Sequence, residues 1–205
     1  WSKKQFLKKL DKFYHKSEKL EVIHQSIDKQ KVNINKKEKL ITFVGKLNSA
    51  KGYDLFGKSI LKILDKHKSW KSIVIGDEPR EKLIFNHRNL KVLGFQNHTK
   101  VLKIFEKTSI AVACSRWEEP FGRTSLEASS RGCAVIVSNR GGLPETITNG
   151  IIVRNLNVKN LYNSINKLIN NDKQRKNLQR SSLKNFYLTD EFICKKIDKY
   201  REKIV

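Results

Sequence analysis

The sequence predicts an α/β protein built on a doubly wound parallel sheet of the Rossmann-like kind. Two observations carry this prediction. Short runs rich in β-branched residues lack the alternation of a half-exposed strand, as expected for strands buried on both faces. Amphipathic helical patterns separate these runs, and strands that alternate with helices form parallel sheets. The runs lie at residues 40–44, 72–75, 90–93, 109–114, 134–137 and 151–153.

Helical patterns fill most of the remaining chain. Buried-face spacing predicts a helix at 53–67, and Val101 to Phe105 marks another that leads into the fourth strand. We also expect a short strand at 20–23, and short helices after Pro79 and at Pro144. The other helices are expected at 1–19, 124–131, 158–170, 173–185 and 190–204.

The stretch from Glu118 to Glu127 lies between two of the buried runs and forms a strand, loop, helix, strand unit. A helix in this position points its N-terminal NH groups at the carboxyl edge of the sheet, where anionic ligands bind. Glu119 lies in the loop and Glu127 lies in the helix, so a carboxylate flanks each side of the anion site. Carboxylates accept hydrogen bonds from sugar hydroxyls and repel phosphate. The pattern therefore indicates a ligand with sugar at both ends and phosphate in the middle, as in a nucleotide sugar. The alternative is a capped crossover helix with surface carboxylates.

Glu119 and Glu127, with seven residues between them, match the E-x7-E motif of retaining GT-B glycosyltransferases of family 4, which this sequence resembles. Glu-Pro-Phe-Gly inside the motif, Leu-Glu-Ala at its end and Gly-Gly-Leu-Pro-Glu at 141–145 strengthen the resemblance. It extends from about residue 22 to the C-terminus. Residues 24–28 resemble the interdomain segment, where the family usually carries Pro-Asn-Gly. The resemblance implies the C-terminal, donor-binding half of the enzyme, without the N-terminal acceptor domain.

The loop after the first strand, Gly45 to Gly52, carries two cations. Lys46 and Lys51 could bracket a diphosphate and stabilise the charge that builds on the leaving nucleoside diphosphate. The family has Arg and then Lys at these places, and a lysine at 46 keeps the charge while losing the bidentate fork. The alternative is two surface lysines among many.

The resemblance also implies roles for the other site residues. Glu119 would contact the donor sugar together with the backbone of Phe121 and Gly122, and Glu127 would hold the ribose hydroxyls. We expect Lys46, Lys51 and Glu119 to be catalytic. The donor-binding set is Gly45, Phe121, Gly122, Arg123, Thr124, Glu127, Gly94 and Phe95, the last two beside the base. Such enzymes use neither a metal nor another cofactor.

Composition limits the partners. Lys and Arg number 43 against 20 Asp and Glu, a net charge of +23, so polyanions are expected partners. A nucleotide and an anionic membrane surface both fit; nucleic acid is not favoured, because the sequence shows no recognised nucleic-acid module. The three cysteines form no CxxC pair, and we expect buried free thiols at Cys114 and Cys133. Free thiols indicate a cytoplasmic protein, and one interpretation places it against the inner face of the membrane. The absence of Met predicts a fragment of a longer protein.

We therefore predict three parts: an N-terminal helix and interdomain segment at 1–38, a nucleotide-sugar-binding domain at 39–187, and a C-terminal crossover helix at 188–205. The predicted function is donor binding in a retaining glycosyltransferase, inactive as an isolated chain. Two other functions stay open. One is a basic nucleic-acid-binding protein on a nucleotide-binding fold, and the other is a non-catalytic sensor of sugar nucleotides.

Overall fold

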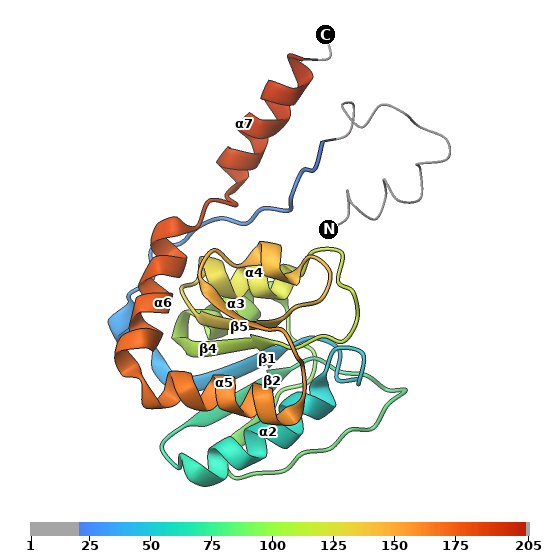
Figure 1. The fold of residues 1–205 in the computed structure, drawn as a ribbon, viewed down its shortest axis with the longest axis vertical. Coiled ribbons are helices and arrows are strands. Elements are labelled where there is room, and N and C mark those ends of the chain that lie inside the picture. The colour runs from blue at the N-terminus through green and yellow to red at the C-terminus, as the bar shows by residue number, and fades with distance from the viewer. Residues whose placement is uncertain (1–20, 204–205) are drawn as a thin grey trace.

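The computed structural model describes residues 21–203, which form one parallel sheet with helices on both faces (Figure 1). The strand order is β3-β2-β1-β4-β5-β6, and every pair of neighbouring strands is parallel. The chain winds outward from β1 in one direction and then, from β4, in the other. The prediction of a doubly wound sheet is confirmed. The helix predicted at 1–19 lies outside the described residues.

All six predicted strands in the body of the chain are present. Their bounds are β1 Glu38–Val44, β2 Lys71–Ile75, β3 Leu90–Val92, β4 Thr108–Ala113, β5 Ala134–Ser138 and β6 Gly150–Val153. They differ from the predicted bounds by one or two residues, mostly at the polar strand ends, where sequence pattern gives the least information.

The helices form two layers. Helices α2 (Tyr53–Lys66) and α5 (Val158–Asn170) cover one face, and α3 (His98–Lys107) and α4 (Arg123–Ser130) cover the other. The remaining elements are η2 (Ile34–Lys36), η3 (Leu143–Thr146), α6 (Asp172–Asn185) and α7 (Asp190–Arg201). Helix α6 packs against α4, α5 and β5, and Pro144 opens η3 as predicted.

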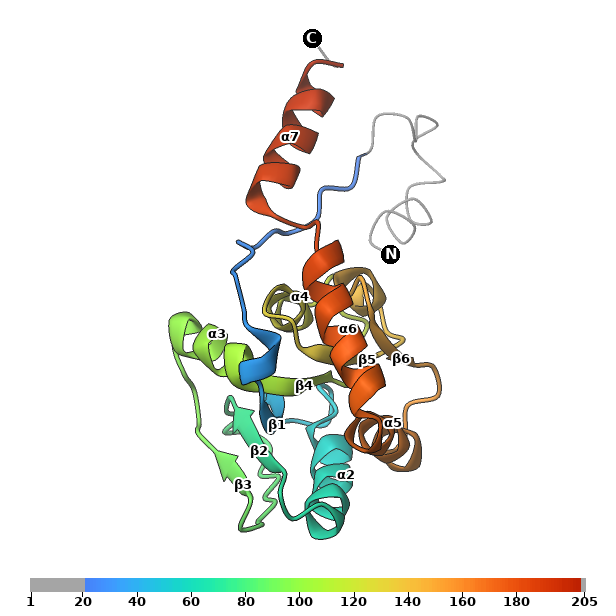
Figure 2. The same cartoon turned by 90° about the vertical axis from the view of Figure 1, so that its left-hand side faces the viewer.

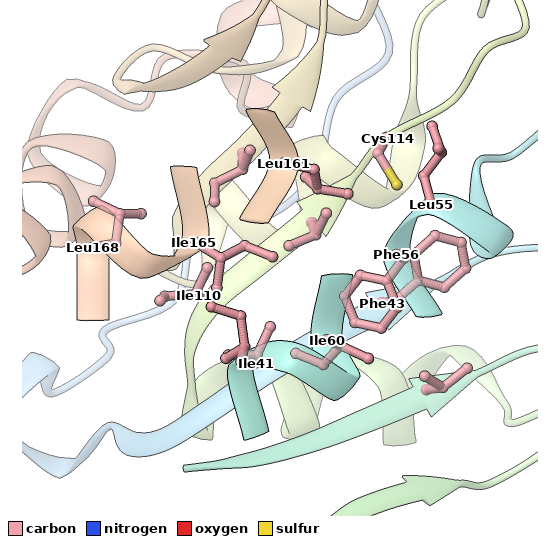
Figure 3. Packing of buried hydrophobic residues seen from close by; sticks show 14 of the residues in the cluster. Ile41, Phe43, Leu55, Phe56, Ile60, Ile110, Cys114, Leu161, Ile165 and Leu168 are labelled. Atoms are coloured by element: carbon pink, nitrogen blue, oxygen red, sulfur yellow. The ribbon is translucent and has the colours of Figure 1, made fainter. Parts of the chain in front are cut away.

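Successive residues of the central strands face opposite layers, as the period of two requires. Ile41 and Phe43 of β1 pack with Phe56 and Ile60 of α2, and Figure 3 shows this cluster together with Leu161, Ile165 and Leu168 of α5. Thr42, between them, faces the other layer and shares a 2.7 Å hydrogen bond with the Thr108 hydroxyl. A sheet that is apolar on both faces needs a layer of helices on each, which explains why the strand patterns lacked alternation.

Two predicted elements are wrong. Residues 21–23 pair with no strand, and the Val22 carbonyl instead accepts a 2.7 Å hydrogen bond from Lys196 Nζ of α7. No helix follows Pro79, because the segment folds back onto the first loop and α2. Glu81 accepts hydrogen bonds from the Ser49 NH at 3.0 and 3.1 Å, and Phe85 stacks edge-on against Tyr53 with ring centroids 5.4 Å apart.

The interdomain segment and α7 run side by side beyond the domain (Figures 1 and 2). Ile27 N donates to Leu188 O at 3.1 Å, and Arg131 Nη1 at the end of α4 donates to Asp28 O at 2.7 Å. The first bond joins the segment to the chain before α7, and the second joins it to the C-terminal end of α4. Among the described helices, none is long and apolar enough to cross a bilayer.

Candidate functional site

A cavity of about 380 Å³ lies at the carboxyl ends of β1 and β4, between the two halves of the sheet where the winding direction changes. Open α/β sheets bind their ligands at this point, and the volume suits a small molecule. Its walls come from five segments far apart in the sequence. They are Gln25; Phe43 to Gly45 and Lys51; Ala113 to Ser115; Glu119 to Ser125; and Leu143.

The helices α2 and α4 both begin beside this cavity, and both are capped by glycine. Gly52 and Gly122 have φ of 74° and 113°, a left-handed conformation that costs other residues free energy. A Cβ at Gly52 would also lie 1.9 Å from the Cys114 carbonyl oxygen. The loop before α2 therefore contacts the end of β4 directly, which closes one side of the cavity.

A partly exposed ion pair fixes this contact. Arg116 forms a bidentate pair with Asp54 of α2, at 2.5 Å from Nη1 and 2.7 Å from Nη2. The Arg116 guanidinium, mainly through these hydrogen bonds, lowers the pKa of Asp54 below its ordinary value. The Arg116 backbone NH also donates to Ala50 O at 2.9 Å. The Gly45–Gly52 loop and the loop after β4 thus form one rigid wall.

Lys51 and Glu119 meet at this wall. The Lys51 ammonium forms an ion pair with Glu119 Oε1, and their side chains are 34% and 12% exposed. Both residues line the cavity. The sequence places them 68 positions apart, and the fold brings a cation and a carboxylate together beside the N-terminus of α4. Such a pair can serve a ligand that carries both an anionic group and hydroxyls.

The Glu119 loop is held from behind by Gly141 and Gly142. Gly142 N donates to Glu119 O at 2.7 Å, and Gly141 N donates to Glu118 Oε2 at 2.5 Å. Arg140 Nη1 adds a 3.1 Å bond to the other oxygen of Glu118. The two glycines therefore support the loop.

Glu127 lies deeper, with 7% of its side chain exposed. His98 Nε2 and Arg123 Nε both lie 2.9 Å from its Oε1. The carboxylate does not line the cavity. Glu127 instead contacts His98 of α3, whereas Glu119 pairs with Lys51 at the cavity.

The predicted site residues divide into two groups. The cavity is lined by Gly45, Lys51, Glu119, Phe121, Gly122, Arg123 and Thr124. Four others lie outside its wall. Lys46 is exposed to solvent, and the Glu127 side chain of α4 contacts His98 instead of the cavity. Gly94 and Phe95 follow β3, and Phe95 is 76% exposed.

Sequence reasoning missed Gln25, Ser115, Leu143 and His98 as residues of this region. Gln25 arrives from the interdomain segment, and only the hydrogen bonds of that segment bring it over the cavity. Ser115 directly follows a predicted strand, so its position at the carboxyl edge could have been inferred, whereas Leu143 lies five residues beyond the end of β5, in η3. His98 follows Asn97, whose side chain caps α3 by accepting from Lys100 N at 2.9 Å, and this cap was the signal that the helix begins there.

The cysteines behave as predicted: all three are free, and Cys114 and Cys133 are buried. Burial raises the pKa of Cys114 to about 12, so its thiol stays protonated although it lines the cavity. Within residues 21–203, no group of three or more His, Cys, Asp and Glu side chains could hold a metal ion.

Comparison with known proteins identifies the family. Residues 24–184 match the family described as "Glycosyl transferases group 1". The chain belongs to this family. Spore coat protein SA of Bacillus subtilis (strain 168) is 28% identical over 162 residues, which cover 71% of this chain and 43% of that protein. The chain spans less than half the length of the curated relatives it matches.

Solved structures share the fold. Anabaena Alr3699/HepE in complex with UDP-glucose superposes with a TM-score of 0.69 and 17% identity, over 81% of this chain and 49% of that one. The C-terminal domain of the group 1 protein LpcC from Francisella tularensis gives a TM-score of 0.63 and 23% identity, over 73% of this chain and 85% of that domain. The neighbours are GT-B glycosyltransferases, so the predicted fold is confirmed, and the coverage corresponds to their C-terminal domain.

Proposed function

We propose that this chain is the donor-binding part of a family 4 glycosyltransferase, which transfers a sugar from a nucleoside-diphosphate sugar to an acceptor with retention of configuration. Membership of the glycosyl transferases group 1 family supports sugar transfer. One observation supports the donor site most strongly. The Lys51–Glu119 pair lines a cavity at the sheet's switch point, directly in front of the N-terminus of α4.

In the proposed complex, the diphosphate lies at the start of α4. The backbone amides of Arg123 and Thr124 and the Lys51 ammonium bind its oxygens, because a helix N-terminus and a cation both favour anions. Glu119 accepts hydrogen bonds from the donor sugar on one side. Glu127 accepts from the ribose hydroxyls on the other. The base lies toward Gly94 and Phe95.

During transfer the bond between the sugar and the diphosphate breaks, and negative charge builds on the leaving nucleoside diphosphate. Lys51 and the N-terminus of α4 stabilise this charge, so the reaction is proposed to need no metal. Lys46 is assigned a lesser part, because its side chain is exposed and lies outside the cavity wall.

The complete protein is proposed to carry an N-terminal acceptor domain, since the curated relatives are more than twice as long as the region they share with this chain. Its proposed location is the cytoplasm, against an anionic inner membrane surface. The free cysteines support the compartment and the net charge of +23 supports the surface.

A thermal-shift panel tests the proposal. UDP-, GDP- and ADP-sugars and the corresponding nucleoside diphosphates are added to the 205-residue chain at constant ionic strength. A ligand present at about 100 times its Kd should stabilise the fold by about 2.7 kcal/mol, a shift of several degrees. At least one nucleotide sugar should raise the Tm, and the same chain should transfer no sugar to any acceptor.

Absence of a shift for every nucleotide would contradict the proposed function. A polyanion site would instead show binding to single-stranded nucleic acid that weakens by orders of magnitude as salt rises. Hydrolysis and transfer assays on the complete protein then separate an enzyme from a sugar-nucleotide sensor.

A further inference from the structure

The Glu127 carboxylate is held in an unusual way: two donors from two different helices share one of its oxygens. His98 Nε2 and Arg123 Nε each lie 2.9 Å from Oε1. Neither of these bonds involves Oε2. The Glu127 side chain is 7% exposed, whereas those of His98 and Arg123 are 50% and 58% exposed. A buried carboxylate therefore lies beneath two half-exposed donors.

The two donors constrain the carboxylate differently. Arg123 is the first residue of α4 and lies one turn from Glu127 on the same helix, so it moves together with the group that it contacts. His98 is the first residue of α3, which packs against α4. Its contact ties the carboxylate to a second element and limits rotation of the carboxylate plane. An ionised carboxylate only accepts, so Nε2 must carry the hydrogen.

We propose that His98 is a positioning residue for the nucleotide: it fixes Glu127 through Oε1 so that Oε2 accepts hydrogen bonds from the ribose hydroxyls. This inference rests on the proposed donor site and extends it to a residue on a different helix. An ionised carboxylate has capacity for about four hydrogen bonds, so two on one oxygen leave the other oxygen available to a ligand. Groups that orient a ligand-binding side chain in this way affect affinity without touching the ligand.

The His98 side chain is half exposed, and Arg123 still donates to Glu127 Oε1 when His98 is replaced, so the loss of this contact should cost little folding stability. Variants at position 98 should therefore fold, and their effect should be confined to binding. His98→Gln can place an amide NH near the position of Nε2, whereas His98→Ala cannot. Lys100→Ala is the matched control, because it removes an exposed side chain from the same first turn of α3.

Calorimetric titration of the four proteins tests the inference with three probes. These are the tightest-binding of UDP, GDP and ADP, its 2′,3′-dideoxy analogue, and inorganic diphosphate. His98→Ala should weaken the natural nucleoside diphosphate by about tenfold and leave the two probes that lack ribose hydroxyls within about twofold of wild type. His98→Gln should restore most of the lost affinity, and Lys100→Ala should match wild type.

Each contrary result has a distinct meaning. An equal loss for all three probes would show that His98 acts on the phosphates, and an unchanged affinity in His98→Ala would show that it does not position Glu127. Failure of His98→Gln to restore binding, with its melting curve unchanged, would also overturn the inference. If wild type binds none of UDP, GDP and ADP, the proposed function fails and this inference falls with it, which the wild-type titration reveals before any variant is compared.

Discussion

Replacing Lys51 by methionine should weaken nucleoside diphosphate binding far more than the same change at Lys46. Methionine keeps most of the aliphatic stem and removes the charge. Lys51 lines the cavity and pairs with Glu119, whereas Lys46 is exposed outside the wall. Loss of the Lys51 ammonium removes a favourable charge from the diphosphate. It also leaves the Glu119 carboxylate, 12% exposed, facing that diphosphate without its cation.

The size of the effect follows from Coulomb's law. Two unit charges about 4 Å apart interact with about 4 kcal/mol at an effective dielectric constant of about 20. Because 34% of the Lys51 side chain is exposed, solvent screening reduces this value. We expect a net loss of about 1.5–3 kcal/mol, the range for a charge-assisted hydrogen bond, which corresponds to a Kd about ten- to a hundredfold higher. Lys46→Met should change the Kd by less than about threefold, as expected for an exposed charge.

Isothermal titration with UDP or GDP measures these values, and a double variant isolates the cause. In Lys51→Met/Glu119→Gln the unpaired carboxylate is also removed, so about half of the lost binding free energy should return. Equal losses at positions 46 and 51 would refute the assignment of Lys51 to the diphosphate. A double variant as weak as Lys51→Met would refute the role of Glu119 repulsion.

Two further predictions concern reactivity and stability. Cys194 should react rapidly with a thiol reagent at pH 8, while Cys114 and Cys133 should react only after unfolding, because burial raises the pKa of both thiols. Three fast-reacting thiols in the native protein would contradict this prediction. Lys37→Met should destabilise the fold by about 2–4 kcal/mol in urea, because Lys37 Nζ donates to the carbonyls at the end of α3 at 2.8, 2.9 and 3.2 Å. Lys36→Met, at an exposed neighbour, should change the free energy of unfolding by less than about 0.5 kcal/mol, and equal effects would remove the special role of Lys37.

The fold could be predicted because its strands are buried on both faces. Runs such as 109–114 and 134–137 are apolar throughout, a pattern that a parallel sheet with two helical layers requires. The failures lie where tertiary contacts decide. Val22 and Ile23 are β-branched, but they pair with no strand, and strand preference mainly reflects packing on a pleated surface. The segment after Pro79 packs its aromatic residue on α2 instead of forming its own helix.

The site could be predicted where a local motif contains it. Glu119 and Gly122 lie within ten residues that carry the resemblance, and both line the cavity. Gln25 belongs to a segment whose place depends on long-range packing, so no local pattern marks it. The Asn97 cap marks the start of α3 at His98, but the contact of His98 with Glu127 depends on the packing of α3 against α4. The exposure of Lys46 follows from the path of the Gly45–Gly52 loop. Arg116 fixes this path, because it donates both to Ser49 O in the loop and to Asp54 of α2. Spacing alone cannot show which of two lysines faces inward.

The polarity of the donor site is tested most directly by titrating Glu119→Ala and Glu127→Ala with two ligands, the nucleotide sugar that stabilises the chain most and its nucleoside diphosphate. Loss of Glu127 should weaken both ligands by about ten- to a hundredfold, because both carry ribose. Loss of Glu119 should weaken only the nucleotide sugar and leave the nucleoside diphosphate unchanged or slightly tighter, because a carboxylate repels phosphate. Circular dichroism confirms that each variant is folded. Equal losses for both ligands in Glu119→Ala would contradict the account, since this carboxylate would then not face the sugar.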